Sequence, residues 1–79
     1  MSAANNIRTI ADMAASERLG LLAFRLREIA FTVQHYDPDE LDFDAIRRVL
    51  VDDRARWPDA VPHVDLVVEI IDDIVAQLS

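Results

Sequence analysis

The sequence contains no cysteine and no lysine, and it has one glycine and three prolines among 79 residues. Without cysteine there are no disulfides and no thiolate metal ligands or nucleophiles. Without lysine there is neither a Schiff-base amine nor the phosphate-binding lysine of a P-loop. The scarcity of glycine and proline predicts short connections between regular elements.

Long apolar runs are also absent. The longest covers residues 19–24, whereas a membrane-spanning helix needs about 18–20 apolar residues. The first 30 residues show neither a basic start nor the apolar stretch and small-residue cleavage site of a secretory leader. We therefore expect a cytoplasmic protein that does not act in or on a membrane.

The charge is strongly of one sign. Fifteen aspartates and glutamates outnumber eight arginines, which gives a net charge of −7. Proteins that bind nucleic acid gain much of their affinity by neutralising phosphates, so this balance argues against direct nucleic-acid binding. The same reasoning argues against anionic membrane surfaces, which attract basic segments.

Helical periodicity begins in residues 6–36. One stripe recurs at heptad spacing: Leu19, Leu22, Leu26, Ile29, Val33 and Tyr36. Upstream, Ile7, Ile10 and Ala14 keep this spacing but lie one residue out of register. The pattern predicts either one long helix over 6–36 or two helices with a bend near Ala15 and Ser16, where Ser16 would be the second N-cap.

Two further helices follow. Asp37-Pro38-Asp39-Glu40 combines a capping box with an N1 proline, and it predicts a helix over 38–56 that ends before Pro58. A third helix is predicted over 62–78. Its apolar stripe at heptad spacing consists of Val61, Val64, Val68, Ile71, Val75 and Leu78.

These segments predict one all-α domain over 1–79, with residues 1–5 flexible. The expected fold is a small three-helix antiparallel up-down bundle with a long first helix, or a four-helix bundle if that helix is broken. A continuous first helix would extend beyond its neighbour and expose an apolar arm. Small domains without disulfides or metals often gain stability by oligomerisation, so we expect a dimer.

The first helix carries apolar residues away from its heptad stripe. Phe24 and Phe31 point nearly opposite to the stripe, with Leu21 nearby and Gly20 alongside, where a missing side chain allows close approach. The predicted partner surface is therefore Gly20, Leu21, Phe24 and Phe31. Two occupants are possible: another chain, most simply a second copy in a homodimer, or an N-terminal helix of the same chain.

The last helix concentrates acidic residues on one side, and we call Asp65, Glu69, Asp72 and Asp73 the acidic stripe. A solvated helix face is the simpler interpretation. The alternative is a surface that meets a basic partner or imitates nucleic-acid phosphates. Helical metal sites need carboxylates from several helices, commonly with Glu-x-x-His. That motif is absent, so we expect no metal.

Three other positions stand out near the predicted helix ends. Trp57 is expected to cap the core, and Asp53 falls inside an apolar arc, where helix-end exposure is the simpler interpretation. His35 and His63 each begin a His-x-Asp sequence. The predicted bundle places them at opposite ends, so we expect local capping and solvent exposure rather than a shared site.

No catalytic constellation is visible, because the serines have no neighbouring base. We expect a protein that is not an enzyme and needs no cofactor. The sequence favours a protein–protein interaction module, such as an adaptor, an antitoxin-like regulator or an accessory subunit. The alternative is an acidic inhibitor that imitates nucleic acid and blocks a DNA- or RNA-binding protein.

Overall fold

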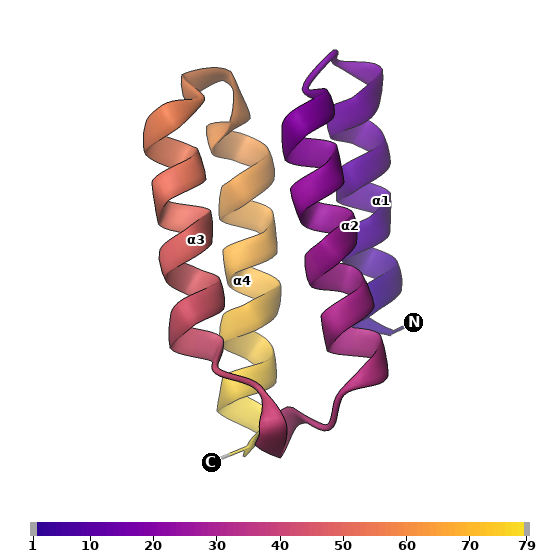
Figure 1. Cartoon of the computed structure of the whole chain (residues 1–79), viewed down its shortest axis with the longest axis vertical. Coiled ribbons are helices and arrows are strands. Elements are labelled where there is room, and N and C mark those ends of the chain that lie inside the picture. The colour runs from indigo at the N-terminus through magenta and orange to yellow at the C-terminus, as the bar shows by residue number, and fades with distance from the viewer. Residues whose placement is uncertain (1, 79) are drawn as a thin grey trace.

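A computed structural model describes residues 2–78, and it is helical throughout apart from short links. The four α-helices are α1 (Ala3–Ser16), α2 (Gly20–His35), α3 (Phe43–Arg56) and α4 (Val61–Leu78). Single 3-10 turns, η1 (Pro38–Glu40) and η2 (Pro58–Ala60), lie before α3 and α4. No strand occurs among the described residues, and the links alternate between the two ends of the molecule (Figure 1).

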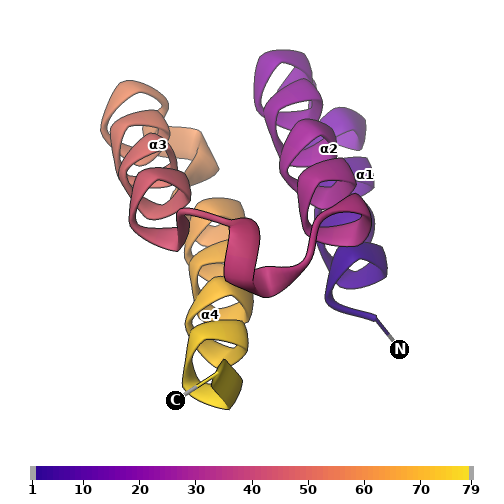
Figure 2. The ribbon, with the colours of Figure 1, turned by 60° about the horizontal axis from the view of Figure 1, so that its bottom comes forward.

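The helices form two hairpins, α1–α2 and α3–α4. α2 packs along α1, α1 packs against α4, and α4 packs against α3, so the contact between the hairpins runs mainly through α1 and α4. α2 and α3 stand apart at the two sides of the molecule (Figure 2). A hollow of about 210 Å³ lies between them, with Ile29 of α2 and Ile46 and Val49 of α3 among its lining residues.

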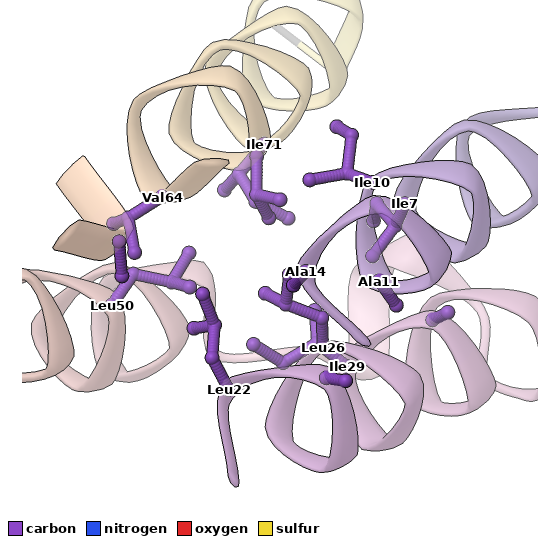
Figure 3. Packing of buried hydrophobic residues seen from close by; sticks show 14 residues of the cluster. Ile7, Ile10, Ala11, Ala14, Leu22, Leu26, Ile29, Leu50, Val64 and Ile71 are labelled. Carbon is purple, nitrogen blue, oxygen red and sulfur yellow. The ribbon is translucent and has the colours of Figure 1, made fainter. Parts of the chain in front are cut away.

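The apolar core is where the hairpins meet. Side chains from all four helices point into it (Figure 3), and those that are fully buried include Ile7, Leu26, Leu50 and Ile71. Many core positions on α1 and α2 are alanines, which lets these two helices pack closely. As the sequence predicted, Trp57 is partly buried and packs against this core.

The long first helix is a wrong prediction, because residues 6–36 form two helices. Arg18 has a left-handed φ of 65°, which ends α1. The amides of Arg18 and Leu19 donate to the carbonyls of Ala15 and Ala14, the paired bonds of a Schellman motif. Ser16 is not an N-cap: it is the last residue of α1, and its hydroxyl donates to the carbonyl of Met13.

The N-terminus of the first segment is also more ordered than predicted. Residues 3–5 were expected to be flexible, but they belong to α1, and Ser2 caps this helix by accepting from the amide of Asn5. Residue 1, which was included in that prediction, lies outside the described residues.

The helix predicted over 38–56 begins later than expected. Pro38–Glu40 makes only a 3-10 turn, and the Asp37 side chain makes no cap bond. Asp42 is the N-cap instead, and its carboxylate accepts from the amide of Ala45 at 3.0 Å. Asp37 was the only cap that the sequence analysis identified, and the structure uses Asp42 in its place.

The α4 stripe is partly different from its prediction. Val64 and Ile71 are buried as expected, but Val67 is buried while Val75 and Leu78 are 37% and 49% exposed. Valine and isoleucine fill so much of α4 that two overlapping stripes satisfy heptad spacing. Contact with α1 and α3 selects the stripe that contains Val67. No helix between residues 2 and 78 combines the length and apolar character that crossing a bilayer requires.

Candidate protein-binding surface

Three large apolar side chains of α2 lie on its outer side. Leu21 is 71% exposed, Phe24 is 64% exposed and Phe31 is 55% exposed; we call these three residues the α2 patch. α1 does fold back onto α2, but it covers the side that carries Leu22, Leu26 and Ile29. The alternative in which an N-terminal helix covers the phenylalanines within the chain is therefore wrong.

The surface around the α2 patch is hollowed. One hollow of about 460 Å³ is lined by both phenylalanines together with Arg27, Glu28 and Thr32. A second hollow of about 350 Å³ is lined by Leu21, Phe24, Arg25, Glu28, Arg56 and Trp57. The two hollows share Phe24 and Glu28, so they form a continuous uneven surface that apolar side chains of a partner can enter.

Gly20, the fourth residue of the predicted partner surface, is the first residue of α2. Its φ is not in the left-handed region, so its backbone conformation does not require glycine. A side chain at this position would meet no atom within 4 Å. Glycine here leaves open space at one end of the α2 patch.

The arginines of α2 are held by carboxylates of other helices. Arg27 lies 3.1 Å from Asp12 of α1 in an exposed ion pair. The Nε of Arg25 lies 3.3 Å from Oδ2 of Asp53 on α3, and the hydrogen-bond geometry is poor, so this contact is an ion pair. Arg25 thereby joins α2 to α3 beside the α2 patch.

Asp53 was predicted to be exposed near the end of its helix. This prediction is wrong, because the residue is only 2% exposed. A buried carboxylate needs a charged or hydrogen-bonding partner. Arg25 supplies it, and it comes from a different hairpin. The signal was present in the sequence, since Asp53 falls inside the apolar arc of its helix, but the partner lies too far along the chain to be identified by spacing.

The two histidines have different environments. His63 is 5% exposed and its Nε2 lies 2.7 Å from Oε2 of Glu17, so its predicted exposure is wrong. This contact fixes the start of α4 to the end of α1. His35 is exposed, as predicted, and its ring centroid lies 4.2 Å from that of Phe31.

The acidic stripe is partly neutralised within the chain. Asp65 pairs with Arg54 at 2.9 Å, and Asp72 pairs with Arg47, so α3 supplies a cation to two of its four carboxylates. Glu69 and Asp73 are exposed on the same helix. Within residues 2–78, no group of three or more histidine, aspartate or glutamate side chains is arranged to hold a metal ion.

Comparison with known proteins gives no relative from which to infer a role. No family model matches the chain, and neither a curated protein nor a solved structure matches it significantly.

Proposed function

We propose that the protein is a small protein–protein interaction module that binds its partner through the α2 patch. The observation that carries the proposal is the exposure of Leu21, Phe24 and Phe31 on one helix, beside hollows that can accept side chains. Contiguous exposed apolar surface on a small protein commonly marks an interaction site. Aromatic side chains often contribute a large share of the binding energy.

In this role the chain acts as an adaptor, an antitoxin-like regulator or an accessory subunit. It works in the cytoplasm, in an up-down helical bundle that associates as a dimer. It performs no chemistry of its own and needs no cofactor, and its affinity comes from apolar burial. Such binding depends only weakly on ionic strength, because salt screens charges and not apolar contacts.

The test uses a tagged Phe24→Gln, Phe31→Gln variant in pull-downs washed at low and high salt. Binding that survives high salt in the wild type should be lost in this variant. A Val51→Gln, Leu66→Gln variant is the matched control, since these residues are 53% and 43% exposed on α3 and α4. Circular dichroism of both variants checks that they remain helical. Equal capture by the wild type and the phenylalanine variant would contradict the proposal.

A second candidate function rests on the acidic stripe. In this second function, α4 imitates nucleic-acid phosphates and inhibits a DNA- or RNA-binding protein. The exposed Glu69 and Asp73 would contact that protein. Its target would be basic, and binding would fall steeply as salt rises. A Glu69→Gln, Asp73→Asn variant should then lose the target, while the phenylalanine variant should keep it. The internal pairing of Asp65 and Asp72 makes this the weaker candidate.

A further inference from the structure

We infer that a second copy of this chain occupies the α2 patch, with the two α2 helices antiparallel about a twofold axis. The inference rests on the proposed function, because it names the partner of the same surface. Closed twofold dimers need a surface that is complementary to itself, so that residue i meets residue j and j meets i. The stripe on α2 that carries Phe24 and Phe31 has this property.

The face is symmetric about the middle of the helix. α2 runs from Gly20 to His35, so its midpoint falls between Arg27 and Glu28. Phe24 and Phe31 lie at equal distances on either side of that point. At about 100° per residue, the two ends and both phenylalanines fall within a stripe roughly 60° wide, flanked by Arg27 and Glu28.

An antiparallel pair centred on this midpoint brings Phe24 of each copy opposite Phe31 of the other. The hollow between the two phenylalanines, about 460 Å³, provides room for the side chains of the second copy. Aromatic rings gain energy from offset or edge-to-face contact in addition to burial. The same register places the open space at Gly20 opposite His35 of the second copy.

The charges at the centre of the face balance when two copies meet. Arg27 and Glu28 are adjacent and opposite in sign, and both line the central hollow. Two copies bring two arginines and two glutamates to the centre of the contact, which therefore carries no net charge. A basic or an acidic partner would complement only one of these charges.

Charge reversal tests this arrangement by sedimentation equilibrium of the full chain. Arg27→Glu and Glu28→Arg should each weaken the dimer by about tenfold or more, because each gathers four like charges at the centre. The double variant, or a mixture of the two single variants, should restore the affinity. Arg54→Glu makes the same charge change in the pair with Asp65 and should leave the dimer unchanged. If the single variants weaken the dimer and the double variant does not restore its affinity, the proposed register is wrong.

Cysteine cross-linking tests the direction of the helices, and the chain has no cysteine to interfere. In the antiparallel pair the two Gly20 positions are about 22 Å apart along the helix axis. A mixture of Gly20→Cys and His35→Cys chains should therefore cross-link far better than either variant alone. Self-cross-linking of Gly20→Cys alone overturns the antiparallel arrangement.

The outcomes separate this inference from the proposed function. A wild-type protein that stays monomeric at millimolar concentration overturns the inference. If the same protein captures another protein through Phe24 and Phe31, the proposed function stands and only the partner is wrong. If neither association nor capture depends on the phenylalanines, both are wrong.

Discussion

At the scale of single residues, the ion pair between Arg25 and Asp53 should contribute unequally from its two sides. Asp53 is 2% exposed, whereas the Arg25 side chain is 39% exposed. Removing Arg25 leaves a buried carboxylate without its partner, while removing the charge of Asp53 leaves an arginine that water can solvate. We expect Arg25→Met to lower the free energy of unfolding by about 1–3 kcal/mol and Asp53→Asn by less.

Urea unfolding of the two single variants and the double variant measures this difference. The double variant should recover most of the stability lost in Arg25→Met, because it no longer contains the buried charge. A greater loss in Asp53→Asn than in Arg25→Met would contradict the argument.

Arg18 is the other residue for which we expect a specific effect on stability, because its backbone conformation is unfavourable. Its φ of 65° is unfavourable for a side chain with a Cβ, and this position of a Schellman motif is usually glycine. Arg18→Gly should raise the free energy of unfolding by about 0.5–1 kcal/mol, after the greater flexibility of glycine in the unfolded chain is included. Arg18→Ala is the control, because it removes the charge and keeps the strained backbone. The measurement is again urea unfolding. A destabilised Arg18→Gly variant would contradict the argument that Arg18 has a strained backbone.

At the scale of elements, the start of α3 distinguishes the observed cap, Asp42, from the predicted cap, Asp37. Asp42 accepts a hydrogen bond from the amide of Ala45, whereas the Asp37 side chain makes no cap bond. Asp42→Ala should therefore cost about 0.5–2 kcal/mol of stability, and Asp37→Ala should cost much less. Thermal unfolding of the two variants compares them directly. Equal costs would mean that α3 begins at Pro38 after all.

The elements show why part of the fold could be predicted from the sequence. Apolar periodicity is local, so helical segments and Pro58 as an endpoint could be identified. The break after α1 could only be offered as one of two alternatives, because it depends on Arg18 adopting a conformation that arginine rarely takes. The buried side of α4 depends on its neighbours, since Val67 and Val68 lie on overlapping apolar stripes.

At the scale of the whole molecule, surface features that depend on local spacing could be predicted, whereas those that depend on contacts between helices could not. Phe24 and Phe31 lie on the side of their helix opposite the heptad stripe. This could be predicted, because it follows from spacing alone. Whether another part of the chain covered them depended on which side of α2 receives α1. The partly buried contact between His63 and Glu17 could not be predicted, since it joins residues 46 positions apart along the chain.

The association proposed for α2 makes the stability of the whole molecule depend on its concentration. If the native state is a dimer and the unfolded state is a monomer, mass action favours the native state as concentration rises. For a chain of this size we expect the midpoint of thermal unfolding to rise by roughly 3–5 °C per tenfold increase in concentration.

The Phe24→Gln, Phe31→Gln variant should unfold at a midpoint that does not change with concentration. Both side chains are more than half exposed in the single chain, so their replacement should leave its core intact. The Val51→Gln, Leu66→Gln control should keep the wild-type slope. Calorimetry over a hundredfold concentration range measures all three proteins. A wild-type midpoint that stays constant over this range would mean that the α2 patch does not hold two copies together, and the exposed phenylalanines would then await a different partner.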